Sequence, residues 1–301
     1  FNSEIGIGLG HRRLSIIDLS SAANQPMTSH CGRFIMVYNG EVYNYKEVAN
    51  NLNILNWKTS SDSEVILEAF IKWGVDFVNE LNGMFAIAIY DLKKNKLFLF
   101  RDRMGIKPMY YSKYGENLIF ASELKAIKQL KKNKKLNHSS IYAYLHLGYI
   151  PKNQTFYENI FKLNPGSYIE FSKNKYKETQ YWFIENKIQN KTISDFNSSK
   201  NQLKFLLQDS IKKRLISDVP IGTFLSGGTD SSIVSAVAQE VSNSPINTFS
   251  IGFKEAKYNE SEHAKKVANH LGTNHYEFIL TQEEALIELE NIMEHFDEPF
   301  A

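Results

Sequence analysis

The sequence predicts two domains of different class: an α+β domain built on antiparallel strands, followed by an α/β domain built on a parallel sheet. The chain has 301 residues, more than one compact core usually holds. Strand-forming runs and turns dominate its first half, whereas strands and helices alternate in its last third. Residues 172–200, rich in Lys, Asn, Gln and Ser, separate the two patterns. We therefore expect domains at 1–171 and 201–301, joined by a linker at 172–200.

The composition excludes several classes of protein. Hydrophobic residues make up 43% and charged residues 23% of the chain, which argues against extensive disorder. The 35 Lys and Arg and the 33 Asp and Glu leave a net charge of +2, so we expect no nucleic-acid partner. No apolar run approaches the ~20 residues that span a bilayer, so we expect no membrane partner. The single cysteine, Cys31, cannot form an internal disulfide, which fits a cytoplasmic protein.

The first domain is expected to combine short strands with a well-marked helix. Residues 34–38 form an apolar run of strand formers, followed by the turn pair Asn39-Gly40. The segment Ser61-Asp62-Ser63-Glu64 has the spacing of a capping box and predicts that a helix begins there. Residues 84–90 and 96–100 flank a polar turn and predict a hairpin. The first run of that hairpin does not alternate cleanly, which indicates a strand buried on both faces.

The second domain is expected to alternate strands with helices. Such alternation predicts a parallel sheet with helices on both of its faces. The expected elements are a helix at Leu203–Leu215, a strand run at Val219–Leu225, a helix at Ser232–Val241, a strand at Thr248–Phe253, a helix at Glu260–Leu271, a strand at Tyr276–Leu280 and a helix at Glu283–Phe296.

The segment Leu225–Ser232 (L-S-G-G-T-D-S-S) carries the strongest chemical signal, because it follows a strand and opens a helix. Unpaired amides and the positive end of the helix dipole make such a loop an anion site. Gly227 and Gly228 let the backbone approach a phosphate, and the serines add hydroxyl donors. Asp230 would be repelled by polyphosphate, so its presence predicts a shared Mg²⁺. The plainer alternative is a glycine turn in which Asp230 or Ser231 caps a helix.

A second set of polar residues lies in the first domain. It comprises Arg13, the turn pair Asn39-Gly40 with Glu41, and Asp62. An arginine can bind an α-carboxylate with two donors, and a carboxylate can bind an α-ammonium group. Taken singly, Arg13 is typical of a surface charge, the turn pair of a hairpin, and Asp62 of a helix cap. Together they predict an amino-acid pocket.

These motifs carry a resemblance that runs essentially from Gly8 to Phe300. The loop resembles the pyrophosphatase loop S-G-G-x-D-S of ligases that form adenylates, and it lacks the lysine of a Walker loop. The first-domain motifs, together with residues 81–86, 101–108 and 121–125, are similar to the class II glutamine amidotransferase domain of glutamine-hydrolysing asparagine synthetases. This resemblance implies an N-terminal nucleophile hydrolase-like first domain and an ATP-pyrophosphatase second domain.

The resemblance also implies roles for single residues. Arg13 would bind the glutamine carboxylate, and Asp62 would hold the glutamine ammonium. The pocket and its oxyanion region would be formed by Asn39, Gly40 and Glu41. ATP would be bound by Leu225, Ser226, Gly227, Gly228, Asp230, Ser231 and Ile251, with Mg²⁺ at Asp230.

The implied activity is that of a ligase. Glutamine would be hydrolysed in the first domain, and its ammonia would attack an aspartate adenylated by ATP in the second, giving asparagine, glutamate, AMP and pyrophosphate. One alternative is a related amidotransferase that aminates another carboxylate, such as a sugar acid in surface-polysaccharide assembly. A second alternative is a binding module that keeps both pockets without catalysis. Whether the protein is a homodimer stays open.

The sequence departs from the family at both ends. Glutaminases of this class use an N-terminal cysteine, whose thiol attacks the amide and whose amine acts as base. This chain begins with Phe1-Asn2-Ser3-Glu4 and stops in the Pro-containing segment 297–301. We therefore expect a chain truncated at both ends, with no catalytic nucleophile and no glutaminase activity of its own. Cys31, in a predicted turn, is expected to be a small loop residue.

Overall fold

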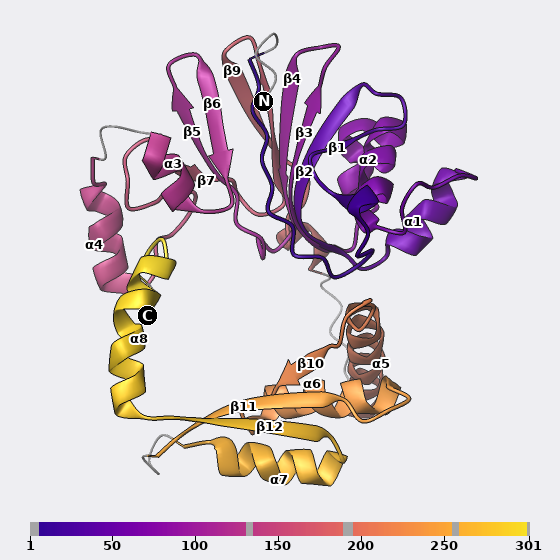
Figure 1. The fold of residues 1–301 in the computed structure, drawn as a ribbon, viewed down its shortest axis with the longest axis vertical. Helices are drawn as coiled ribbons and strands as arrows, with labels where there is room; N and C mark the ends of the chain where they lie inside the picture. Colours follow the sequence, from indigo (N-terminus) through magenta and orange to yellow (C-terminus); the bar gives the residue numbers. More distant parts are fainter. Residues whose placement is uncertain (1–5, 131–134, 189–194, 255–258, 300–301) are drawn as a thin grey trace. The chain divides into compact units, whose positions relative to one another are not determined.

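The computed structural model describes residues 6–130, 135–188, 195–254 and 259–299, and the chain forms two compact units (Figure 1). The first unit comprises Phe1–Ile188 and Phe296–Ala301, and the second comprises Gln189–His295. The expected start at Phe1–Glu4 and the last two residues lie outside the described ranges.

The first unit contains two antiparallel sheets. The six-stranded sheet has the order β1-β2-β3-β4-β8-β9, and the three-stranded sheet has the order β6-β5-β7. The strands of the larger sheet are β1 (Met27–Thr28), β2 (Phe34–Val42), β3 (Gly83–Asp91), β4 (Lys96–Arg101), β8 (Ser167–Ser172) and β9 (Lys175–Gln180). The smaller sheet consists of β5 (Tyr110–Tyr114), β6 (Asn117–Ala121) and β7 (Phe161–Lys162). The helices are α1 (Tyr45–Leu52), α2 (Asp62–Trp73), α3 (Leu124–Leu130) and α4 (His138–Leu147).

These elements stack as helix, sheet, sheet and helix. Phe70 of α2 meets Phe34 and Phe98 of the large sheet edge to face, with ring centroids 5.3 and 5.2 Å apart. The opposite face of that sheet packs against the small sheet through a continuous apolar cluster. Leu124 and Ile127 of α3 are fully buried against the outer side of the small sheet. The expected α+β fold is confirmed, and β3 is the central strand buried on both faces that its sequence predicted.

The expected turn at Asn39-Gly40 is wrong. Strand β2 runs straight through both residues, with Asn39 opposite Ala86 and Gly40 opposite Phe85 of β3. A Cβ atom on Gly40 would lie 2.1 Å from the Met84 carbonyl oxygen. This glycine therefore allows a close approach of two strands, which a pattern read along one strand does not distinguish from a turn.

Helix α2 begins where its sequence predicted, with Ser61 as the N-cap residue. The Ser61 hydroxyl accepts a hydrogen bond from the amide of Ser63 at 3.2 Å. The reciprocal half of a capping box is absent, because Glu64 instead accepts from the amides of Lys58 and Thr59 at 3.0 and 2.7 Å. This arrangement leaves Asp62 as the first residue of the helix and buries it beside β2.

The second unit is an α/β structure with a parallel sheet of order β10-β11-β12, as expected. Its elements are α5 (Phe196–Arg214), β10 (Gly222–Phe224), α6 (Thr229–Val241), β11 (Asn247–Phe253), α7 (Ser261–Leu271), β12 (Asn274–Leu280) and α8 (Gln282–His295). The stretch expected to be a linker differs from that expectation, because residues 175–180 form β9 in the large sheet of the first unit.

Among the residues that the structure describes, helices cover one face of this sheet rather than the expected two. Helices α6 and α7 contact each other and the strands. Two successive right-handed crossovers that advance in the same direction place both helices on the same face. The apolar side chains of Phe249, Ile251 and Phe278 are correspondingly exposed.

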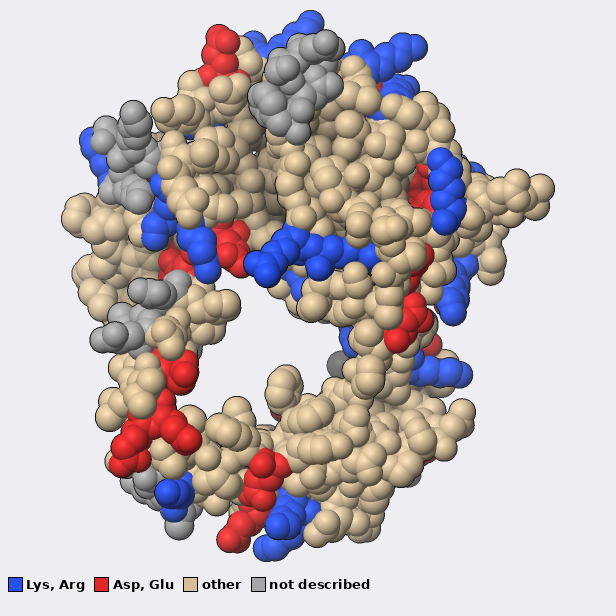
Figure 2. Space-filling model, in the orientation of Figure 1, with Lys and Arg blue, Asp and Glu red and all other residues tan. Residues whose placement is uncertain are grey.

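Charge is mixed over the visible surface, where Lys and Arg side chains occur together with Asp and Glu (Figure 2). Within the described ranges, no helix combines the length and apolarity that crossing a membrane requires.

Candidate functional site

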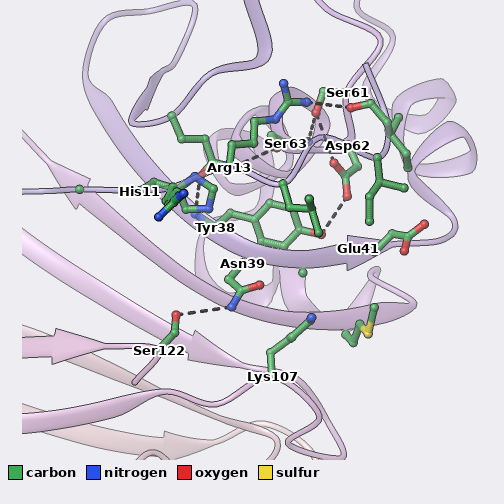
Figure 3. A pocket seen from close by; sticks show the side chains of 18 of the residues that line it. His11, Arg13, Tyr38, Asn39, Glu41, Ser61, Asp62, Ser63, Lys107 and Ser122 are labelled. Atoms are coloured by element: carbon green, nitrogen blue, oxygen red, sulfur yellow. Dashed lines mark hydrogen bonds between the residues drawn. The ribbon is translucent and has the colours of Figure 1, made fainter. Parts of the chain in front are cut away.

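A cavity of about 430 Å³ lies beside strand β2 in the first unit (Figure 3). Its walls come from residues 10–17, from β2, from the start of α2, and from the segments around residues 107 and 121–126. The structure brings all five residues predicted for the glutamine pocket to this cavity: Arg13, Asn39, Gly40, Glu41 and Asp62.

Asp62 is held by donors from three directions. Its Oδ2 accepts hydrogen bonds from the Tyr38 hydroxyl at 2.8 Å and the Val42 amide at 3.0 Å, and its Oδ1 accepts from the Ser61 hydroxyl at 3.3 Å. Burial raises the pKa of Asp62 above its ordinary value, although these hydrogen bonds oppose the shift. Burial, and then the neighbouring Asp62, also raise the pKa of Tyr38, so the tyrosine stays a neutral donor. An ammonium group at this wall would relieve the buried negative charge.

Arg13 binds its own loop. Its two terminal nitrogens donate to the carbonyl oxygens of Ile17, Asp18 and Ser20 at 2.8, 2.6 and 3.2 Å. These bonds use three of the five guanidinium donors and orient the group along the cavity wall. Among the described residues, Arg13 makes no other hydrogen bond, so the structure gives it a loop-holding role that the sequence did not reveal.

The side chain of Asn39 points to the opposite side of β2 from Asp62 (Figure 3). The Asn39 amide nitrogen lies 3.5 Å from the hydroxyl oxygen of Ser122, which follows β6 (Figure 3). Such a long hydrogen bond leaves the Asn39 amide available to a ligand oxygen. Because Gly40 has no side chain, the same stretch of β2 exposes its backbone to the cavity.

Tyr38, Lys107 and His11 also line this cavity, and none of the three was assigned a role from the sequence. Tyr38 is one position before Asn39, and only the packing of α2 against β2 shows that its hydroxyl meets Asp62. Lys107 lies in the segment 101–108 that carried the family resemblance, which was its only signal. The His11 Nδ1 is buried without a hydrogen-bond partner among the described residues, and burial followed by Arg13 lowers the pKa of His11.

The segment Leu225–Ser232 runs from the end of β10 into the first turn of α6 in the second unit, so it follows a strand and opens a helix as predicted. Gly227 has φ +82°, and a Cβ there would lie 2.6 Å from the Cβ of His263. The hydroxyls of Ser226 and Ser231 lie 2.9 Å apart, and the Ser231 hydroxyl accepts from the Ser226 amide at 3.2 Å. The Ser232 hydroxyl is buried and has no partner within the described part of the chain.

The alternative in which Asp230 or Ser231 caps a helix is wrong. Helix α6 begins at Thr229 with Gly228 as its N-cap residue, so neither Asp230 nor Ser231 occupies the N-cap position. Asp230 is exposed in the first turn. One carboxylate beside a phosphate-binding loop suits Mg²⁺, which is commonly held by one or two carboxylates together with phosphate oxygens. Among the residues that the structure describes, no group of three His, Cys, Asp or Glu side chains gathers around a metal position.

A second cavity, of about 200 Å³, adjoins this loop. Its lining includes Leu225, Ser226 and Ile251, three of the residues predicted to contact ATP. Leu225 is fixed there because its amide donates to the Phe249 carbonyl oxygen at 2.8 Å, which continues the pairing of β10 with β11. The loop and this cavity therefore adjoin at the end of the parallel sheet, where ligands of α/β proteins usually bind.

Cys31 is exposed in the turn between β1 and β2, and it is not among the residues that line the first cavity. This placement agrees with its expected character as a loop residue.

Comparisons with known proteins match both units. Residues 1–182 match the family described as glutamine amidotransferase domain, and residues 202–301 match the family described as asparagine synthase. The chain belongs to the family of glutamine-hydrolysing asparagine synthetases. It is 39% identical to a putative glutamine-hydrolysing asparagine synthetase 2 of Methanocaldococcus jannaschii, an alignment that covers 98% of the chain and 60% of that protein.

Two bacterial members of the family are similarly related. Identity is 33% with asparagine synthetase 3 of Bacillus subtilis and 32% with asparagine synthetase B of Escherichia coli. These alignments cover 93% and 96% of the chain but 48% and 49% of the two relatives. The chain thus spans about half the length of these asparagine synthetases. Membership of this family confirms the predicted fold class for both units.

Proposed function

We propose that this protein is a glutamine-dependent ligase that makes asparagine. Glutamine binds in the first unit and is hydrolysed to glutamate and ammonia. ATP binds in the second unit and adenylates the side-chain carboxylate of aspartate. Ammonia then displaces AMP from this adenylate, so that asparagine, glutamate, AMP and pyrophosphate are the products. The observation that supports the proposal is that the residues predicted for glutamine line one cavity, and three of those predicted for ATP line another, in one chain of this family.

In the first unit, the residues around the cavity suit the functional groups of glutamine. Asp62 would hold the α-ammonium, and the remaining donors of Arg13 would bind the α-carboxylate. The Asn39 amide and the Gly40 backbone would donate to the oxygen of the side-chain amide as it gains negative charge. The nucleophile of this family is an N-terminal cysteine, and none of the described residues is assigned to that role.

In the second unit, the amides of the loop and the start of α6 would bind the phosphates of ATP. The orphaned hydroxyl of Ser232 supplies one further donor to this loop. Leu225 and Ile251 would contact the adenine ring in the adjoining cavity. Asp230 would hold Mg²⁺, which neutralises charge on the pyrophosphate leaving group when bound. In this proposal the exposed carboxylate of Asp230 binds the metal, and the amides at the start of α6 bind the phosphates.

The test uses the complete gene product supplied with glutamine, ATP, Mg²⁺ and either aspartate or a panel of other carboxylates, including sugar acids. We expect AMP, pyrophosphate, glutamate and asparagine to form together when aspartate is present. Formation of AMP only with another acceptor would show that the protein aminates a different carboxylate. Binding of glutamine and ATP without any product would contradict the enzyme and support a binding module.

A further inference from the structure

Hydrogen bonds from the side chains of Arg101 and Asp102 fix the backbone of Lys107, which lines the proposed glutamine cavity. Asp102 is 1% exposed, and its carboxylate accepts from the amides of Lys107 and Ile106, both at 2.9 Å. The Arg101 guanidinium donates to the carbonyl oxygens of Lys107 at 2.9 Å and Gly105 at 2.8 Å. The buried carboxylate of Asp102 and the half-buried guanidinium of Arg101 thus hold the amide and the carbonyl group of Lys107.

The side chains of Arg101 and Asp102 also bind other parts of the first unit. Arg101 also donates to the carbonyl oxygen of Leu163 at 2.6 Å, and Asp102 also accepts from the Phe85 amide at 3.2 Å. The next residue, Pro108, further restricts the backbone of Lys107 to an extended conformation. The position of the Lys107 backbone is therefore determined by the core, as expected for a side chain with a function in the cavity.

Lys107 is the member of this segment that lines the cavity, and its side chain is half-buried. Within the described ranges, its ammonium group makes no ion pair with a carboxylate. A partly desolvated cation without a partner favours a bound anion. Figure 3 shows Lys107 beside Asn39, on the opposite side of β2 from Asp62 and Arg13.

We propose that Lys107 binds the side-chain end of the amino acid and makes this pocket selective for a carboxylate at that position. This inference rests on the proposed function, in which Asp62 and Arg13 bind the α-groups and Asn39 faces the side-chain amide. Hydrolysis replaces the neutral amide of glutamine with a negatively charged carboxylate. Lys107 therefore distinguishes product from substrate, so that glutamate is retained in the pocket and inhibits the reaction.

The experiment measures glutamate binding to the complete gene product by calorimetry, together with the KM for glutamine and the competitive inhibition constant for glutamate. In Lys107→Met we expect the dissociation and inhibition constants of glutamate to rise about tenfold, because one charge of a partly desolvated pair is removed. The KM for glutamine should change less than about twofold, since the amide carries no charge. Lys107→Arg keeps the charge and should retain most of the glutamate affinity. Lys113→Met, exposed on β5, is the matched control and should match the wild type.

Three results would overturn the assignment. If wild type binds glutamate and Lys107→Met binds it equally well, Lys107 does not meet the side-chain carboxylate. If Lys107→Met raises the KM for glutamine and the dissociation constant of glutamate by the same factor, the substitution has damaged the pocket in general. If the wild-type protein uses neither ligand, the proposed glutamine site itself is wrong, a result distinct from the first two because it appears before any substitution.

Discussion

Replacement of Asp62 by asparagine tests the glutamine site most directly, because it removes a charge and preserves the shape of the side chain. The carboxamide oxygen of asparagine can take the place of Oδ2, which accepts from Tyr38 and Val42. The Ser61 hydroxyl can turn to accept from the new amide nitrogen. The substitution weakens the hydrogen bonds of residue 62, because they no longer involve a charged group. It also removes the cost of burying a charge, since Asp62 is only 6% exposed. We therefore expect the free energy of unfolding to change by only about 1 kcal/mol.

The effect on glutamine should be much larger. Removing one partner of a desolvated ammonium–carboxylate pair costs about 2–5 kcal/mol, which corresponds to a rise of roughly 30-fold or more in the KM for glutamine. The assay measures glutamate release against glutamine concentration, and asparagine formation with ammonium salts as the nitrogen source. The second rate should stay within about twofold of wild type, because the ATP unit is unchanged.

A matched control is Asp91→Asn, the same change at another buried carboxylate. Asp91 is bound to Arg33 with an Nη2–Oδ2 distance of 2.6 Å and lies outside the residues that line the cavity. This variant should lose stability and keep the wild-type KM for glutamine. The assignment of Asp62 fails if Asp62→Asn has a wild-type KM, or if synthesis from glutamine and from ammonium falls equally.

Three further predictions follow from the same contacts. Asp230→Asn should lower AMP formation and weaken its dependence on Mg²⁺ while glutamate release continues; identical Mg²⁺ titrations for both forms would exclude the metal role. Gly40→Ala should lower the melting temperature by forcing β3 away, because its Cβ would lie 2.1 Å from the Met84 carbonyl oxygen, an overpacking cost of about 1–3 kcal/mol; an unchanged melting temperature would contradict the close approach of the strands. Because burial raises the pKa of Asp62 above 3.8, ionisation of this group destabilises the fold as pH rises. Urea unfolding should therefore show wild type losing stability relative to Asp62→Asn as pH increases from 3.8 upward, and parallel curves would contradict this.

The chemical content of both sites could be predicted from the sequence, because it depends on short segments with local rules. A loop of glycines, serines and an aspartate between a strand and a helix predicts an anion site wherever it occurs. The helix beginning at Ser61 follows from its capping residues, and the central strand β3 follows from an apolar run without alternation. The elements of the second unit were predicted to within three residues, apart from the start of α5, which lies at Phe196 rather than at the expected Leu203, because alternating strands and helices have distinct periods.

The contacts within the sites were decided by tertiary structure. Asn39 and Gly40 have the composition of a turn, yet they continue β2, because only glycine lets β3 approach at that position. Whether Arg13 binds a ligand or its own loop depends on where residues 17–20 fold back, which no local pattern specifies. Likewise, the face of the parallel sheet that the helices cover depends on the direction of successive crossovers, which is a property of topology rather than of any one segment.

The sequence by itself determined which functional groups are present, and the tertiary structure determined which of them meet. The types and order of the residues identify a family and two pockets, since glycine, serine and charged side chains have their chemistry wherever they lie. Tyr38 meets Asp62 only because α2 packs on β2. Lys107 enters the cavity only because the side chains of Arg101 and Asp102 both bind its backbone after β4. Those contacts join residues that are far apart in the chain. Burial and electrostatic interactions depend on distance in space, so the local sequence does not specify them.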